Sequence, residues 1–390
     1  MIELTKVQLQ ESISKFMEEE NGLTAILQMT LNGLMHSERR TFLENSVGNK
    51  GNGYRRALAV GMGKQIELSI PRDRLGMFEP VVLALIRDQR AQMEDLSFEL
   101  YGKGLTTSQI GGIMEKIYGR HYSPSAISHI TTTFYEQMRQ WRQRPLDPYY
   151  LAVYIDAIQI KIRRDTVSSE AFYVLLGVKE DYTREVIGIV NIPNESASGW
   201  KEVLSSIRQR GVGQIGIIVS DNLPGLDAVI PLVFKDTDHQ KCVVHLKRNI
   251  QNKVASKHKE EIAQDLNEVF DLDLTEDTVA KAFGRLKSFS EKWKDKYRFI
   301  GNLSENETNE LYFTYTRYHS KIRRMLYTTN WIERLNKDFR RTFKIRNSMP
   351  NFEAALTLLS KVAMDKEEEH FKYPIYNFKF DTRLNRKPNS

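Results

Sequence analysis

One aspartate constrains this chain more than any other residue. Residues 149–160 read YYLAVYIDAIQI and are rich in β-branched and aromatic side chains, so they predict a buried strand with Asp156 inside it. An isolated carboxylate in such a strand is costly unless it is paired or binds a metal ion. We therefore expect the fold to bring partners for Asp156 from elsewhere in the chain.

Two other acidic residues stand in comparable positions. Asp221 closes the apolar run 215–221, and Glu333 follows the segment 327–332 on what we expect to be a helix. Each has a simpler interpretation, because Asp221 can cap the helix that follows it and Glu333 can pair with Lys337 one turn later. The residues alone leave these alternatives open.

Three carboxylates, two at strands and one on a helix, suit a divalent-metal site for phosphodiester chemistry. Mg²⁺, or Mn²⁺ in its place, prefers hard oxygen ligands and keeps several waters, so few protein carboxylates suffice. Two such ions can activate an attacking oxygen and stabilise a leaving oxygen in phosphoryl transfer. On this interpretation Asp156, Asp221 and Glu333 are the catalytic residues and the ligands of two metal ions.

The predicted helix around Glu333 is basic on its polar side. Its apolar stripe consists of Ile332, Leu335, Phe339 and Phe343. Between residues 330 and 346, six basic residues stand against two acidic ones, a net charge of +4. A metal-binding acid inside a basic face fits a substrate with a phosphate backbone. We therefore predict DNA contacts from Asn330, Arg334, Lys337, Arg340, Arg341, Lys344 and Arg346.

The overall composition agrees with a nucleic-acid partner without establishing one. The chain carries 57 Lys and Arg against 50 Asp and Glu, a net charge of +7, which is only a modest basic excess. Cys242 is the only cysteine, which excludes an internal disulfide and a zinc site built mainly from cysteines. The N-terminus lacks a signal-peptide pattern and no run of ~20 apolar residues predicts a membrane helix. We expect a cytoplasmic protein.

The hydrophobic periodicity and the composition change several times along the chain, and these changes predict five segments. In order, we expect a helical segment, a small β-hairpin, a helical DNA-binding domain, an α/β catalytic domain and a basic tail, at residues 1–50, 51–77, 78–145, 146–365 and 366–390. The first helix can pack within the chain or serve dimerisation. The tail is expected to be extended, either solvated or in contact with phosphates.

Two short helical patterns within residues 78–145 follow the grammar of a helix-turn-helix. Thr106 is a candidate N-cap of the first, which ends at Gly119, and Ser123 with Pro124 opens the second. An ordinary helical hairpin would show the same pattern. In a helix-turn-helix, the second helix would present small polar side chains to base edges or phosphates, namely Ser125, Ser128, His129 and Thr132.

The catalytic segment predicts a mixed five-stranded sheet with an all-helical insertion. Its patterns follow the order βββαβαβ, with strands at 150–163, 171–179, 184–192, 215–220 and 240–244. Strand patterns are absent from about 246 to 325, which we expect to be helical. Ligands of such sheets bind at strand ends near a change of strand order.

Cys242 and His245 have the spacing of half a zinc site, but the chain offers no second cysteine pair. His245 can contact a phosphate or a metal-bound water near the end of the sheet, or it can be a core histidine with its hydrogen bonds satisfied. The residues favour neither interpretation.

Four segments together carry a specific resemblance. They read YIDA, VSDNLPGL, CVVHLKRN and YTTNWIERLN, at residues 154–157, 219–226, 242–249 and 327–336. In this order they resemble the Mutator-type transposases of bacterial insertion sequences, and the likeness extends from about Gly53 to Pro350. Asn222 stands where members often have glycine and Trp331 where a small residue is common; neither is one of the three acids.

The resemblance implies an RNase H-like catalytic fold with a DDE metal site. Asp156, Asp221 and Glu333 take the acid positions, and Cys242 with His245 takes the C-x-x-H motif. It also implies recognition of terminal inverted repeats in double-stranded DNA, Mg²⁺-dependent 3′-end cleavage, strand transfer into target DNA and a circular intermediate. A homodimer in the bacterial nucleoid is the corresponding expectation.

Two other functions stay open at this point. A DNA-binding regulator that has lost catalysis would need none of the three acids, so their retention argues against it. An RNase H-like, structure-specific nuclease would share the acid site but would require no terminal repeat.

Overall fold

The chain folds into two compact units, Met1–Thr133 and Phe134–Ser390, and each has its own hydrophobic core. The computed structural model describes residues 22–61, 64–118, 124–163, 165–192, 196–274 and 276–385. The segment boundaries expected from the sequence stay predictions.

The first unit consists of helices and one hairpin. Its elements, in chain order, are α2 (Gly22–Glu44), β1 (Gly51–Gly61), β2 (Lys64–Asp73), α3 (Val81–Gly102), α4 (Thr107–Tyr118) and the first half of α5 (Pro124–Gln143). Helix α2 packs within the chain, because Met35 shares a core with Ile66 and Leu68 of β2. Other apolar side chains of α2 stay exposed, among them Met29 at 63%.

The predicted hairpin is present and lies within the expected residues 51–77. Strands β1 and β2 pair antiparallel from Gly51 opposite Asp73 to Gly61 opposite Lys64. The first residues of β1 join the ladder through an irregularity between Gly51 and Tyr54. Gly53 has a φ of 66° there, a conformation that glycine adopts without steric cost.

The candidate helix-turn-helix is described only in part. Thr106 caps α4 as predicted: its Oγ1 accepts the Gln109 N–H at 3.2 Å, and Gln109 Oε1 accepts the Thr106 N–H at 2.9 Å. Gly119 and Ser123 lie outside the described residues. So do the side chains of Ser125, Ser128 and His129, whereas Thr132 is exposed. The helix-turn-helix and its DNA contacts stay predictions.

The second unit is built around the predicted mixed sheet. Its first elements follow the expected order βββαβαβ and are β3 (Tyr149–Arg163), β4 (Val167–Val178), β5 (Arg184–Asn191), α6 (Ala197–Gln209), β6 (Gln214–Ser220), α7 (Leu226–Val233) and β7 (Asp238–Lys241). The strands lie in the order β5-β4-β3-β6-β7. Strand β4 is antiparallel to its two neighbours, and β3, β6 and β7 are parallel to one another.

Helices complete the unit. They are α8 (Val243–Lys253), η1 (Ser256–His258), α9 (Lys259–Val269), α10 (Val279–Trp293), α11 (Arg298–Glu305), η2 (Glu307–Arg317), α12 (Ser320–Leu326), α13 (Asn330–Arg346), α14 (Phe352–Lys366), η3 (Glu367–Phe371) and η4 (Tyr376–Phe380). The described residues between 246 and 325 contain no strand, so the helical insertion is confirmed. Trp293 is buried in it at 1% exposure, as core packing predicts.

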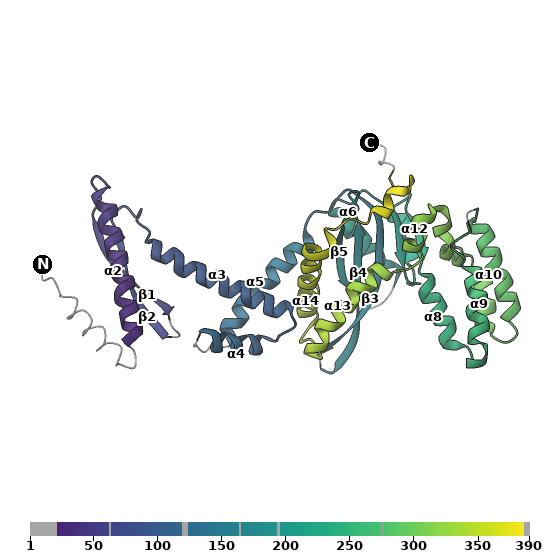
Figure 1. Cartoon of the computed structure of the whole chain (residues 1–390), viewed down its shortest axis with the longest axis horizontal. Coiled ribbons are helices and arrows are strands. Elements are labelled where there is room, and N and C mark those ends of the chain that lie inside the picture. Colours follow the sequence, from purple (N-terminus) through teal and green to yellow (C-terminus); the bar gives the residue numbers. More distant parts are fainter. Residues whose placement is uncertain are drawn as a thin grey trace. The chain divides into compact units, whose positions relative to one another are not determined.

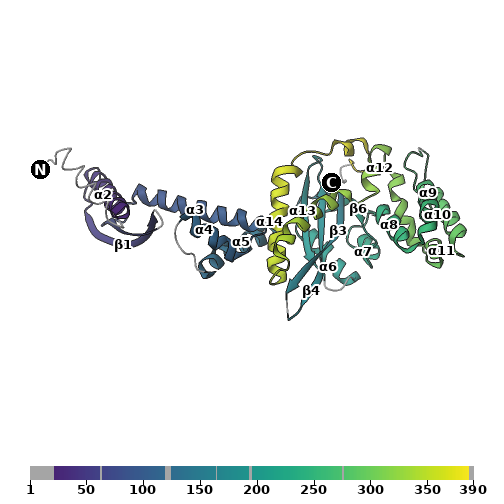
Figure 2. The ribbon, with the colours of Figure 1, turned by 60° about the horizontal axis from the view of Figure 1, so that its bottom comes forward.

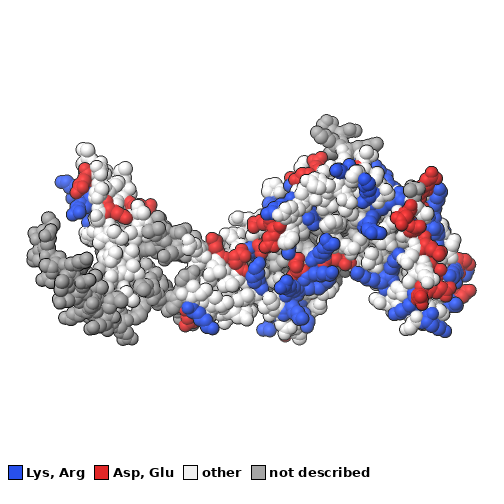
Figure 3. Space-filling view, viewed as in Figure 1, with Lys and Arg blue, Asp and Glu red and all other residues white. Residues whose placement is uncertain are grey.

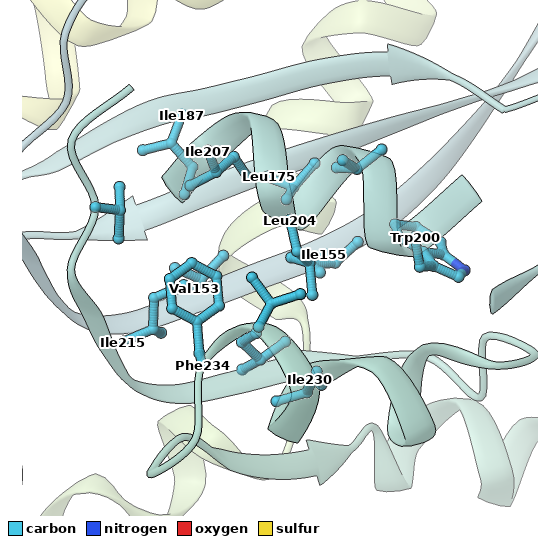
Figure 4. Close-up of a cluster of buried hydrophobic side chains, with 14 of the residues drawn as sticks. Val153, Ile155, Leu175, Ile187, Trp200, Leu204, Ile207, Ile215, Ile230 and Phe234 are labelled. Atoms are coloured by element: carbon cyan, nitrogen blue, oxygen red, sulfur yellow. The ribbon is translucent and has the colours of Figure 1, made fainter. Parts of the chain in front are cut away.

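The sheet lies between two helical layers. Helices α6 and α7 cover one face, and α13 and α14 cover the other (Figure 1 and Figure 2). The core under α6 and α7 includes Val153, Leu204, Ile218 and Trp200, all buried (Figure 4). Since successive side chains of a strand point to opposite faces, Val153 and Ile155 of β3 face this core while Asp156 faces α13.

The fifth strand ends earlier than predicted. We expected strand 240–244, but β7 ends at Lys241 and α8 begins at Val243. The β-branched pair Val243-Val244 resembles a strand, yet Val243, Leu246 and Ile250 are spaced for one buried helical face. His245 consequently lies on the first turn of a helix and not on a strand.

The prediction of an extended C-terminal tail is wrong for residues 371–385. Phe378 and Leu384 are buried at 0% and 1% exposure. The Tyr149 hydroxyl of β3 donates to the Leu384 carbonyl at 2.7 Å, and the His319 N–H donates to Asp381 at the same distance. Apolar residues spaced between the lysines and arginines dock the segment on the second unit.

The part of the chain that the structure describes contains no helix long and apolar enough to cross a membrane.

Docking of the C-terminal segment predicts that substitutions of two aromatic residues in it, one buried and one exposed, will change the free energy of unfolding by different amounts. Phe378→Ala should lower the free energy of unfolding by about 3–5 kcal/mol, because it leaves a cavity in a closed core. Tyr373→Ala, at a side chain that is 63% exposed, should change it by less than about 1 kcal/mol. Denaturant titration of the full chain compares them, and small, equal effects would contradict docking.

Candidate active site

Strands β3 and β6 place two of the predicted acids side by side. Their parallel ladder ends with Ile155 opposite Ser220, and Asp156 and Asp221 are the next residues of the two strands. Neighbouring strands lie about 4.8 Å apart. Asp156 is 5% exposed, and burial first, then the negative charge of Asp221, raises its pKa to about 6.

An amide from α13 holds the Asp156 carboxylate. Asn336 Nδ2 donates to Asp156 Oδ2 at 2.6 Å, and the N–H of Ala157 donates to Oδ1 at 2.9 Å. Both bonds favour the charged carboxylate and counteract part of the burial effect. Asn336 was missed at the sequence level, although an amide beside Leu335 in the apolar stripe is an unusual residue to bury.

Glu333 reaches the same site from the first turn of α13. Its Oε1 lies 3.2 Å from Arg248 Nη1 and 3.7 Å from His245 Nε2, both on α8. These contacts, and not an ion pair with Lys337, engage Glu333 in the described part of the chain. Arg248 was not among the residues singled out in the sequence.

His245 lies between two of the acids. Its Nδ1 is 2.5 Å from Asp221 Oδ1, while Nε2 faces Glu333. The contact with Asp221, followed by that with the Cys242 thiol, raises the pKa of His245 to about 10. At neutral pH the ring is therefore a cation between two carboxylates. His245 therefore lies near the end of the sheet, as one of the two interpretations held, and not in the core. Its contact with a phosphate or a metal-bound water stays a prediction.

Cys242 lies beside His245. The thiol is buried, and Thr329 Oγ1 donates to Sγ at 3.5 Å. Burial raises its pKa, but hydrogen bonds with His245 and Thr329 outweigh burial, so the pKa is lowered overall. Candidate ligand atoms of Asp221, Cys242 and His245 lie within 4.8 Å of one another.

A second buried histidine supports the end of β6. His239 Nε2 lies 2.9 Å from Ser220 Oγ, and that hydroxyl also donates to the Asp221 carbonyl at 2.8 Å. Burial lowers the pKa of His239 to about 3, so the ring is neutral. The pair fixes the backbone from which Asp221 projects.

The donor set suits a hard divalent cation. The carboxylates of Asp221 and Glu333 both contact His245, and Asp156 lies close enough to Asp221 for the charge of Asp221 to raise its pKa. Carboxylate oxygens are the ligands that Mg²⁺ and Mn²⁺ prefer. The positive charges of His245 and Arg248 lie beside Asp221 and Glu333. The Cys242 sulfur lies nearby, but the carboxylate oxygens still favour a hard cation such as Mg²⁺.

The polar side of α13 is a basic surface next to these acids. Arg334, Lys337, Arg340, Arg341 and Lys344 are exposed, as is Asn330, and Arg346 is half-buried. A patch of Lys and Arg covers this helix (Figure 3). On this side Asp338 is neutralised by Lys366 at 3.1 Å. The Trp331 ring lies near the guanidinium groups of Arg184 and Arg334, 5.2 and 5.5 Å from its centroid.

A family model described as "Transposase, Mutator family" matches residues 2–373. The chain belongs to the Mutator family of transposases. It is 30% identical to the transposase of insertion sequence element IS905 of Lactococcus lactis, over 94% of this chain and 90% of the relative. It is 33% identical to the ISRM3 transposase of Rhizobium meliloti, over 90% and 86% of the two chains.

A more distant relative extends the comparison. The chain is 27% identical to the transposase of IS256 in transposon Tn4001 of Staphylococcus aureus, over 92% of this chain and 93% of the relative. The resemblance found in the sequence is therefore confirmed. Transposases act on DNA, and the family as a whole cleaves and rejoins it.

The role of Asn336 as a positioning residue can be tested separately from its role in stability. Among the residues that the structure describes, none bonds to its Oδ1 although Asn336 is fully buried, so Asn336→Leu removes an unsatisfied acceptor and should fold. The variant should lose about 10–100-fold in DNA cutting. It should also need more Mn²⁺ for half-maximal rate, because Asp156 is no longer held.

The matched control is Asn249→Leu, at an exposed position of α8. Cutting rates across a Mn²⁺ titration, with circular dichroism to verify folding, compare the two variants. A folded Asn336→Leu protein with the wild-type Mn²⁺ dependence would show that the amide does not position Asp156.

Proposed function

We propose that the second unit is an RNase H-like DDE catalytic domain and that Asp156, Asp221 and Glu333 are its catalytic acids. The observation that carries the proposal is that Asp156 and Asp221 follow the paired ends of adjacent strands β3 and β6, while Asp221 and Glu333 both contact His245. Asp221 lies 65 residues after Asp156 in the sequence, and a helical insertion precedes Glu333, so this proximity is specific to the fold.

The acids would hold one or two Mg²⁺ or Mn²⁺ ions, which supply electrophilic stabilisation of the attacking and leaving oxygens. Asn336 and Ala157 keep the Asp156 carboxylate aimed at the site. His245 and Arg248 limit the repulsion among the acids before DNA and cations arrive. The Cys242 thiol contacts His245 and helps to hold the ring in place.

The chemistry is two successive phosphodiester exchanges. In the first, a water oxygen bonds to the phosphorus at the element end and the bond to the 3′ oxygen breaks, which leaves a 3′-OH and a 5′-phosphate. In the second, that 3′ oxygen bonds to the phosphorus of another phosphodiester and displaces its 3′ oxygen, which takes up a proton. Neither step requires an oxidant or a nucleotide cofactor.

The substrate is double-stranded DNA with terminal inverted repeats, joined later to target DNA. We assign base and phosphate contacts to Ser125, Ser128, His129 and Thr132 of a helix-turn-helix. The basic surface of α13 holds the backbone near the acids, since Lys and Arg there neutralise phosphates. The working form is a homodimer in the bacterial nucleoid, and exposed apolar side chains of α2 such as Met29 are available for its interface.

Substituting the acids tests the assignment. Asp156→Asn, Asp221→Asn and Glu333→Gln should each reduce cutting of a duplex with the terminal repeat by at least about 100-fold, because each removes a charged ligand. Gel-shift affinity for the same duplex should not fall. Asp236→Asn, at an exposed acid outside the site, is the matched control.

Three outcomes separate the candidate functions. Loss of cutting in the acid variants alone supports the proposal. Wild-type protein that binds the duplex but never cuts it in Mg²⁺ or Mn²⁺ would identify a regulator. Equal cutting of branched DNA without a terminal repeat would identify a structure-specific nuclease.

The circular intermediate has its own test. Cells that carry the element and express the wild-type protein should contain a junction between the two element ends, amplified by outward-facing primers. Cells with Asp156→Asn should contain none, because junction formation requires strand transfer. A junction of equal abundance in both would rule out this enzyme as its source.

A further inference from the structure

Strand β3 continues well beyond its partner β6. The β3–β6 ladder ends at Ile155, whereas pairing with β4 continues to Arg163 opposite Val167. On the β6 side, pairing resumes only at Ile162, which bridges to Met349. Between Asp156 and this bridge, no strand of the described chain pairs with that edge of β3.

The open edge forms one wall of a groove. Ile158, Gln159, Ile160 and Lys161 of β3 face Arg340, Phe343, Lys344, Asn347 and Ser348 across a cavity of about 260 Å³. The groove begins two residues after Asp156, so it lies roughly 7–17 Å along the strand from the candidate active site.

The backbone at this edge offers hydrogen-bond donors to the groove. The Lys161 carbonyl accepts from the Met349 N–H, and the Arg163 N–H donates to the Met349 carbonyl, each at 2.8 Å. The peptide groups of alternate residues face the same edge of a strand. Gln159, two residues before Lys161, therefore directs its N–H toward the groove.

The groove is lined by three cations and no acid. Lys161, Arg340 and Lys344 are exposed at its rim. In the described part of the chain, no ion pair with an acid holds any of the three, and Asp338 on the same helix already pairs with Lys366. Cations gathered around a cavity with a free backbone N–H are the donors that bind phosphate oxygens in protein–DNA interfaces.

We propose that this groove between β3 and α13 binds the backbone phosphates of the DNA strand a few nucleotides from the cut site. Lys161, Arg340 and Lys344 neutralise the phosphates, and the Gln159 N–H donates to one of them. The proposal rests on the proposed function for the location of the cut. It adds Lys161 and a defined path for the strand, which continues from the acids along the free edge of β3.

An open strand edge can also receive a peptide strand from a second copy of the chain. The three cations favour DNA, because an added peptide strand carries no negative backbone charge for them to neutralise. The two occupants make different predictions about salt dependence and self-association.

The test uses the full-length protein and a random-sequence 30-bp duplex, so that it does not depend on cutting or on the terminal repeat. Lys161→Gln/Lys344→Gln should reduce the slope of log affinity against log salt concentration by about 2, since each lost phosphate contact contributes about 0.9. The matched control, Lys201→Gln/Lys235→Gln, removes the same charge at exposed positions of the same unit and should leave the slope unchanged.

A second measurement locates the phosphates. In a duplex carrying the terminal repeat, single methylphosphonate substitutions should weaken wild-type binding at positions a few nucleotides from the cut. The groove variant should lose this sensitivity there and keep it elsewhere. An unchanged salt slope would overturn the proposal, and an unchanged slope with altered sedimentation would assign the edge to a second copy of the chain. If the wild-type protein fails to cut DNA, the catalytic assignment is wrong, but the salt-slope result still tests phosphate binding in the groove.

Discussion

The electrostatic balance among three carboxylates is the interaction on which the rest of the second unit depends. Asp156 and Asp221 follow directly after the last residue pair of β3 and β6, so the sheet forces two negative charges together. Burial first, and then this repulsion, raises the pKa of Asp156. His245 lies against Asp221 and faces Glu333, and its own pKa is raised in response. A protonated histidine thus substitutes for part of the positive charge that the acids attract.

Maintaining this balance requires two helices to begin at defined places. Helix α8 starts immediately after β7, which brings His245 and Arg248 over the ends of β3 and β6. Helix α13 starts at Asn330 and runs along β3, which brings Glu333 to the site and Asn336 under Asp156. The unsatisfied Asn336 Oδ1 and the nearby acids lower the stability of the fold locally, and burial of the surrounding hydrophobic core offsets this loss. Such costs concentrate where a protein binds or reacts.

Sequence patterns predicted the parts of this structure that depend on local periodicity. The order βββαβαβ and the helical insertion were predictable because apolar spacing distinguishes strands from helices. The same reasoning failed at Val243-Val244, where two β-branched residues belong to a helix. It also failed for the C-terminal segment, where many basic residues suggested a solvated tail although Phe378 and Leu384 are buried. Both errors arose where tertiary packing overrides a short local pattern.

The sequence by itself determined that Asp156 is an acid in an unusual setting with Asp221 and Glu333 as candidate partners, and its four linked motifs determined the family. Only the tertiary structure decided that Asp156 and Asp221 follow adjacent strand ends and that Asp221 and Glu333 both contact His245, because strand register and helix packing are contacts between residues far apart in the chain. It also decided the partners: His245 between two carboxylates, Asn336 beneath Asp156, and an open β3 edge beside α13. A pattern along the chain specifies which face a residue turns to the core, but only the packed fold specifies what it meets there.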